Sequence, residues 1–301
     1  MLNKQEMKNA TVDFEMLAEL ESHLSLTTKK YLKGTFKTAT NRIIDFDINY
    51  SSVLAKSMAN NNGYTVLIGR NLTKSLLSFC NYVAKDLHKH LNWSGNEDIT
   101  YFLFYYIYWF ILNHELSHII FGHLDYIKTN GVVRLTPEGK KTLRLHSNDE
   151  INTRYWHALE SEADGNAMPI CLQTFFVINT SEHWKNLTHL DVIKIHGVLA
   201  TLVYTFMDVL SGDEPDMTHP EPYIRQNLTL PCLDVLARQI GVNTEEYTKT
   251  VIESHLHFSA MFLKKCPSND EILKSFYWMK SLDSILKEMK THKKRTTIKQ
   301  P

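Results

Sequence analysis

The fold is decided by the sequence NHELSH at residues 113–118, together with the run ITYFLFYYIYWFIL at residues 99–112 that leads into it. The run contains no charged residue, glycine or proline, so it predicts a helix that is buried on most sides. His114 and His118 are four residues apart, which places both imidazoles on one face of a helix, one turn apart. The two rings can therefore bind a single metal ion.

Glu115 directly follows the first of these histidines and completes an H-E-x-x-H pattern. In zinc hydrolases this pattern supplies two metal ligands and a carboxylate that acts on a metal-activated water. The chain contains 15 histidines, so a match by chance has to be weighed, and the interpretation needs support from other segments.

A catalytic zinc ion needs a third protein ligand, and the sequence ESEAD at residues 160–164 offers one. Glu160 and Asp164 lie one turn apart on one face of a second predicted helix. One carboxylate can then bind the metal while the other accepts a hydrogen bond from a ligand histidine. We expect Glu160 to be the ligand and Asp164 the hydrogen-bond partner. Glu162, on another face of this helix, and His157 remain as alternatives for the third ligand.

These segments resemble the gluzincin group of zinc peptidases, in which a Glu-x-x-x-Asp helix follows the H-E-x-x-H helix. A later segment, THPEPYIR at residues 218–225, resembles the Thr-His-Pro…Arg element of the zinc peptidases that include the CAAX prenyl proteases, the HtpX heat-shock protease and their soluble minimal relatives. The resemblance covers residues 101–228. It implies a zincin-like core, a bound Zn²⁺ and, by motif position, His219 and Arg225 as the residues that stabilise the oxyanion.

Two further groups are similar in part, the ImmA/IrrE proteases and the Lit-type phage-exclusion protease. The metzincin pattern is excluded, because it requires glycine and histidine three and six residues after His118, where Phe121 and Leu124 stand. His123, five residues after His118, fits the pattern common among the relatives of the CAAX proteases.

The rest of the sequence predicts an α+β fold that is mostly α-helical, with a small β-sheet next to the central H-E-x-x-H helix. Glycine is scarce, at 11 residues, and so is proline, at 8. Alternating apolar residues predict a strand at 42–50, and the run at 64–68, between the turn signal at 60–63 and Gly69, predicts a second that could pair with the first. A short strand is predicted at 132–135. Helices are predicted at 11–32, 72–91, 98–128, 155–176 (with a kink or end at Pro169) and 187–210, with three more between 223 and 290.

We expect a single domain at residues 1–290, with its core at 40–228 and a helical part at 229–290, followed by a basic tail at 291–301. Lysine and arginine together number 33, as do aspartate and glutamate, so the chain has no excess of positive charge that would indicate binding to nucleic acid. The apolar run is shorter than the roughly 20 residues that cross a bilayer, so no stable membrane span is expected. Four scattered cysteines and a polar N-terminus are typical of a cytoplasmic protein.

Together these features favour a zinc-dependent endopeptidase that acts on a protein or peptide. In this hypothesis His114, His118 and Glu160 hold the zinc ion, which lowers the pKa of its water, and Glu115 is the general base. The unmatched ends of the chain favour a dedicated protease with one protein target, of a phage, defence or regulatory type.

An edge strand at 43–50 or 64–68 is expected to align the substrate backbone. Two alternatives remain open at this point. One is a regulatory module that binds zinc and a partner without catalysis, and the other is a helical scaffold whose H-E-x-x-H arose by chance.

Overall fold

The computed structural model describes residues 12–35, 43–49, 55–61, 63–90, 99–135, 141–178, 189–210 and 219–220, with isolated residues and short runs in 222–257 and 281–288. Most of the predicted C-terminal helices, and all of the basic tail, lie outside these residues. The described part is mostly helical with a small β-sheet, as predicted.

The helices and strands follow one another in this order: α2 (Phe14–Thr35), β1 (Ile43–Asn49), β2 (Ala55–Ala59), β3 (Gly63–Gly69), α3 (Arg70–His90), α4 (Ile99–Ile120), α5 (His123–Asn130), β4 (Val132–Leu135), β5 (Lys141–Arg144), α6 (Asp149–Ile178) and α7 (His189–Leu210).

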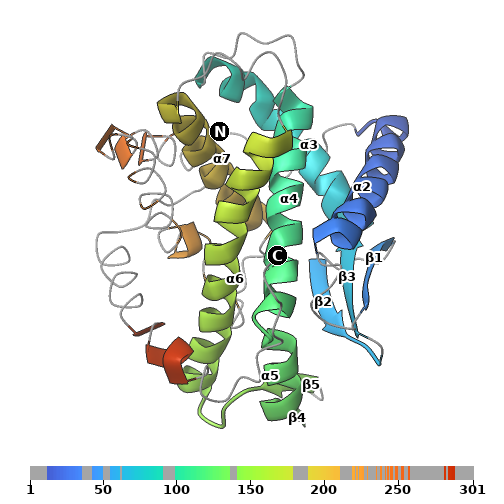
Figure 1. The fold of residues 1–301 in the computed structure, drawn as a ribbon, viewed down its shortest axis with the longest axis vertical. Helices are drawn as coiled ribbons and strands as arrows, with labels where there is room; N and C mark the ends of the chain where they lie inside the picture. The colour runs from blue at the N-terminus through green and yellow to red at the C-terminus, as the bar shows by residue number, and fades with distance from the viewer. Residues whose placement is uncertain are drawn as a thin grey trace.

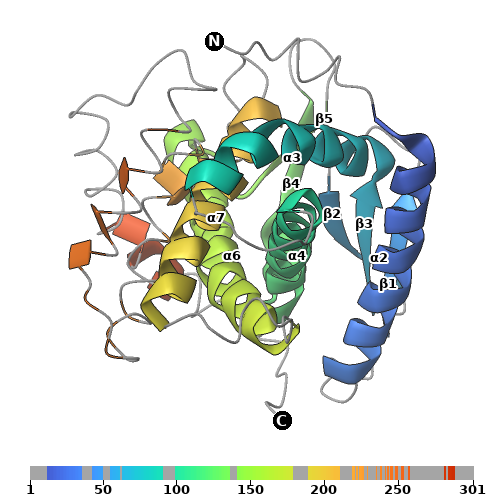
Figure 2. The same ribbon diagram turned by 90° about the horizontal axis from the view of Figure 1, so that it is seen from above.

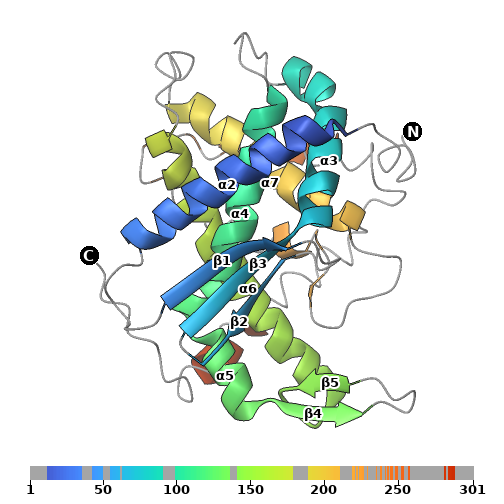
Figure 3. The same ribbon diagram turned by 90° about the vertical axis from the view of Figure 1, so that its right-hand side faces the viewer.

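The three-stranded sheet has the order β1-β3-β2. β1 and β3 run parallel, with Ile44 opposite Tyr64, so the predicted pairing is confirmed. β2 runs antiparallel to β3. Of the two segments expected to offer an edge strand, 43–50 corresponds to β1, which is an edge of the sheet. The alternative, 64–68, is wrong, because β3 is central and its Val66 and Ile68 are fully buried. The edge strand that contacts α4 is β2, which the sequence analysis did not predict (Figure 3).

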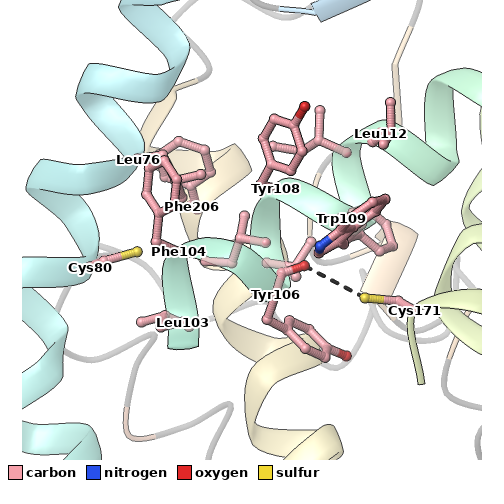
Figure 4. Packing of buried hydrophobic residues seen from close by; sticks show 14 of the residues in the cluster. Leu76, Cys80, Leu103, Phe104, Tyr106, Tyr108, Trp109, Leu112, Cys171 and Phe206 are labelled. Atoms are coloured by element: carbon pink, nitrogen blue, oxygen red, sulfur yellow. Dashed lines mark hydrogen bonds between the residues drawn. The ribbon is translucent and has the colours of Figure 1, made fainter. Parts of the chain in front are cut away.

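α4 is the central element of the molecule. Figures 1 and 2 show it between α6 and α7 on one side and the sheet on the other, with α3 alongside. Its apolar first half packs against residues from several helices, among them Leu76 and Cys80 of α3 and Phe206 of α7 (Figure 4). Apart from Tyr101 at its start, the helix has little surface facing solvent, which explains why its sequence lacks a polar stripe.

α6 runs antiparallel to α4 and beside it (Figure 1). Near the start of α4, the Cys171 thiol donates a hydrogen bond of 3.5 Å to the Tyr106 carbonyl (Figure 4). Near its end, His114 Nδ1 lies 2.8 Å from Asp164 Oδ1. Residue numbers fall along α6 as they rise along α4, so this pairing brings Glu160 to the second turn of the H-E-x-x-H segment.

The predicted helix over 98–128 is interrupted. α4 ends at Ile120 and α5 begins at His123, with Gly122 between them at φ 71° and ψ 24°. Glycine adopts this left-handed conformation without the steric cost that a Cβ would add. The prediction of one continuous helix is therefore wrong, because a single glycine breaks it.

α6 begins earlier than predicted, since Asn148 Oδ1 accepts a hydrogen bond of 3.1 Å from the Ile151 amide and caps the helix. Pro169 lies inside α6 and does not end it. The short strand at 132–135 is confirmed as β4, and it pairs with β5, which was not predicted.

Two thiols, Cys80 and Cys171, are buried and free, as expected. The other two cysteines lie outside the described residues. Among the helices that the structure describes, none combines the length and the apolar character needed to cross a membrane.

Candidate metal centre

Side chains of α4 and α6 converge where the two helices lie side by side. His114 Nε2 and His118 Nε2 are 3.1 Å apart. Glu160 places Oε2 3.2 Å from His114 Nε2 and Oε1 3.5 Å from His118 Nε2. All three side chains are buried. Within the described residues, no other three side chains of this kind are placed to share a metal ion.

The distances within this group fit a zinc site. Metal–ligand bonds of about 2.0–2.1 Å in a tetrahedral site place neighbouring ligand atoms about 3.3 Å apart. The observed separations of 3.1, 3.2 and 3.5 Å lie around this value. Glu160 Oε2 is buried, and although histidine nitrogens lie 3.2 and 3.4 Å away, it makes no hydrogen bond of good geometry among the described residues; a cation would satisfy it. Two imidazoles and one carboxylate also suit Fe(II), so the ligand set alone does not select zinc.

Asp164, one turn after Glu160, contacts His114 on the side away from the other ligands. Its Oδ1 accepts a hydrogen bond of 2.8 Å from His114 Nδ1, the contact expected from the Glu-x-x-x-Asp spacing. Arg225 donates to both oxygens of Asp164, from Nε at 2.7 Å and from Nη2 at 2.8 Å. Burial raises the pKa of Asp164, but the charge and hydrogen bonds of Arg225 outweigh it, so this pKa lies below its usual value.

The two histidines of this group, His114 and His118, have opposite pKa shifts. Burial lowers the pKa of His118 well below its usual value. Burial acts on His114 in the same direction, but hydrogen bonds and charges of Asp164 and Glu160 outweigh it and raise this pKa to about 10. Glu160 and Asp164 therefore favour a positive charge at this place, which a bound metal ion could also supply.

Glu115 is buried beside this group, 8% exposed, and burial raises its pKa above the usual value. The Ser57 hydroxyl hydrogen-bonds the Glu115 carboxyl group. Ser57 belongs to β2, so the edge strand lies next to the residue that the sequence predicts as the general base. Sequence reasoning missed Ser57, because its strand gives only a weak alternating pattern.

His219 and Arg225 reach the same site from the segment after α7. His219 is 45% exposed by its side chain, and its Nε2 lies 3.4 Å from Glu160 Oε2. Arg225 is buried, with Nη2 3.9 Å from that oxygen, but its bonds go to Asp164. Thr218, the first residue of the predicted Thr-His-Pro element, lies outside the described residues.

The alternatives for the third ligand are not brought into this group. Glu162 Oε2 instead lies 3.0 Å from Nε2 of the fully buried His123. His123 Nδ1 in turn lies 2.8 Å from His118 Nδ1. The five-residue spacing from His118 drew attention to His123 in the sequence. Its contact with His118 was not foreseen, because a continuous helix over 98–128 would have placed the two side chains on different faces.

No protein-family model, curated protein or solved structure matches this chain. The functional argument therefore rests on the geometry of the site and on the motifs in the sequence.

Proposed function

We propose that this chain is a zinc-dependent endopeptidase with a zincin-like core. The observation that carries the proposal is the convergence of His114, His118 and Glu160, with Glu115 adjacent in the sequence and buried beside them. A site that only holds a metal for stability needs no carboxylate next to its ligands. The resemblance of the three motifs to gluzincin peptidases supports the same reaction.

His114, His118 and Glu160 would hold the ion in this proposal. When bound, zinc supplies an activated water and polarises the scissile carbonyl. Glu115 accepts a proton from the attacking water and returns it to the leaving amine, a role suited to a buried carboxyl group whose pKa is raised.

His219 and Arg225 have different roles in this mechanism. His219 is exposed at the edge of the ligand group, where its Nε2 can donate a hydrogen bond to a developing oxyanion. Arg225 is bonded to Asp164 through two nitrogens, so we assign to it the charge balance and orientation of Asp164. Asp164 then keeps His114 Nδ1 protonated and leaves Nε2 for the metal.

β2 is the proposed binding strand for the substrate. It is the edge of the sheet that contacts α4, and its Ser57 reaches Glu115. An extended peptide can pair with such an edge through main-chain hydrogen bonds. A protein or peptide substrate, cleaved in a dedicated regulatory or defence role, is therefore favoured. The free, buried thiols favour a cytoplasmic location.

The first test measures zinc and iron per chain in protein purified without added metal. We expect close to one zinc ion in the wild type and a sharp loss in Glu160→Ala. Glu150→Ala is the matched control, since it removes an exposed acidic side chain of the same helix that lies outside the ligand group. Well-folded wild-type protein without zinc would end the proposal, and iron in its place would redirect it to a different chemistry.

The second test compares new protein N-termini in cells that express the wild type or Glu115→Gln. Termini that appear only with the wild type identify candidate substrates, whose cleavage is then measured with purified proteins. Because Glu115 is the only proposed base, kcat should fall by about 10²–10⁴ while zinc stays bound. Equal cleavage by both proteins would remove Glu115 from the mechanism. An unchanged biological effect of Glu115→Gln would favour a zinc module without catalysis.

A further inference from the structure

His118 has an interaction on the side away from the ligand group that the mechanism above does not use. Its Nδ1 lies 2.8 Å from Nδ1 of His123. Nε2 of His123 lies 3.0 Å from Glu162 Oε2. His123 is fully buried, and the Glu162 side chain is 11% exposed. His118, His123 and Glu162 therefore form a row of three side chains that begins in the ligand group and ends at a carboxylate on α6.

The protons in this row can be arranged in one way if His118 binds a metal. Metal binding needs an unprotonated Nε2, so a neutral His118 carries its proton on Nδ1. That proton is donated to His123 Nδ1, which must then be an acceptor. A neutral His123 has its own proton on Nε2, where Glu162 accepts it. Each step is fixed by the one before it.

The backbone is shaped to place His123 in this row. α4 ends two residues after His118, and the left-handed Gly122 turns the chain so that α5 begins with His123 against the previous turn. Its ring centroid lies 5.0 Å from that of His118, with the two planes at 69°. A continuous helix would place residues five apart on different faces.

We propose that His123 is a positioning residue, which with Glu162 holds His118 in the tautomer and orientation that bind the metal. This inference rests on the proposed zinc site and assigns to His118 the support that Asp164 gives to His114. Each of the two ligand histidines is thus held at its Nδ1, His114 by a carboxylate directly and His118 by a carboxylate through a second imidazole. Outer partners of this kind typically contribute 10–100-fold in metal affinity.

The test compares zinc affinity in two near-isosteric variants. In His123→Asn, the side-chain carbonyl oxygen can take the place of Nδ1 and accept the proton from His118. In His123→Gln, the amide reaches the position of Nε2, so the contact with Glu162 is kept and the acceptor for His118 is lost. We expect the dissociation constant for zinc to rise about 10–100-fold in His123→Gln and to recover most of this loss in His123→Asn.

His196→Gln is the control for loss of a buried imidazole, because His196 is fully buried and bonds to Tyr106, eight residues before His114. It should change the unfolding free energy and leave zinc affinity as in the wild type. Equal zinc affinities of the two His123 variants would overturn the role of His123, while the proposed zinc site would stand. A wild type that binds no zinc would overturn both.

A second measurement does not depend on whether the variants fold. Nitrogen NMR of histidine-labelled wild-type protein with zinc reports the tautomer of each ring. We expect His118 with its proton on Nδ1 and His123 with its proton on Nε2. A proton on Nδ1 of His123 would contradict the proposal.

Discussion

His114 and His196 are both buried, at 5% and 0% exposed, yet their pKa values shift in opposite directions. Burial lowers the pKa of His196 to about 3, and its partner at 2.5 Å is the neutral Tyr106 hydroxyl. The pKa of His114 rises to about 10, because the charges and hydrogen bonds of Asp164 and Glu160 outweigh the same burial effect. The group opposite each histidine decides the outcome: a neutral hydroxyl of α4 faces His196, and two carboxylates of α6 face His114.

The comparison separates two uses of buried polar groups along α4, one facing α7 and the other facing α6. In the His196 region a single neutral hydrogen bond satisfies the imidazole and fixes the packing of α4 against α7. In the His114 region the carboxylates of Glu160 and Asp164 lie next to the imidazoles, and the negative charge of these carboxylates has to be balanced. Only the second arrangement has a reason to attract a cation.

The largest expected effect comes from breaking that charge balance. Arg225→Met would leave the buried carboxylate of Asp164 without its two charged hydrogen bonds, and the free energy of unfolding should fall by about 3–5 kcal/mol. Urea unfolding measures this. Arg154→Met is the control, because its exposed pair with Glu150 should contribute at most about 1 kcal/mol. Similar losses in both variants would contradict the account.

A smaller effect tests the neutral side of the comparison through pH. The pKa of His196 is about 3 when folded and 6.5 as the reference for the unfolded chain. The unfolded state therefore binds more protons, and the stability that His196 contributes is full above pH 6.5 and is lost as pH falls toward 3. The slope is about 1.4 kcal/mol per pH unit, or about 2 kcal/mol between pH 6.5 and 5.

His196→Gln isolates this contribution, because glutamine does not titrate. Between pH 7 and pH 5, the unfolding free energy of the wild type should fall by about 2 kcal/mol more than that of the variant. If the unfolding free energies of the two proteins changed with pH in parallel, the pKa of His196 would not be lowered by folding.

The smallest expected change in stability concerns the turn at Gly122, which places His123 beside His118. Gly122→Ala should cost about 1–2 kcal/mol, because φ there is 71° and a Cβ disfavours that conformation. Gly34→Ala is the matched control in α2, where nothing lies within 4 Å of an added Cβ, and it should be neutral or stabilising by up to about 1 kcal/mol. Equal stability of the two variants would remove strain at Gly122 from the argument.

Much of this arrangement follows from local spacing in the sequence. The four-residue intervals between His114 and His118, and between Glu160 and Asp164, each predict a shared helix face, and in the structure both faces point at the same place. The strands predicted at 42–50 and 64–68 correspond to β1 and β3, because alternating apolar residues in the first and the flanking turn residues of the second are local signals.

Features that depend on long-range pairing could not be predicted. β2 has few large apolar residues and exists as a strand because β3 pairs with it. The contact of Tyr106 with His196 joins residues 90 apart, and no spacing rule connects them. The hydrogen bonds from Arg225 to Asp164 also depend on the fold. The sequence offered only the position of Arg225 in its motif, which predicts a role at the oxyanion.

The burial of the three candidate ligand residues, none more than 8% exposed, has a consequence for kinetics. An ion held among them could leave only when the surrounding side chains move apart, and the most exposed of these is His219. Exchange with free metal and capture by chelators would then be slow compared with diffusion, and limited by local opening of the protein. Which ion a molecule carries would depend on what was available while it folded, so the history of a preparation would matter as much as its buffer.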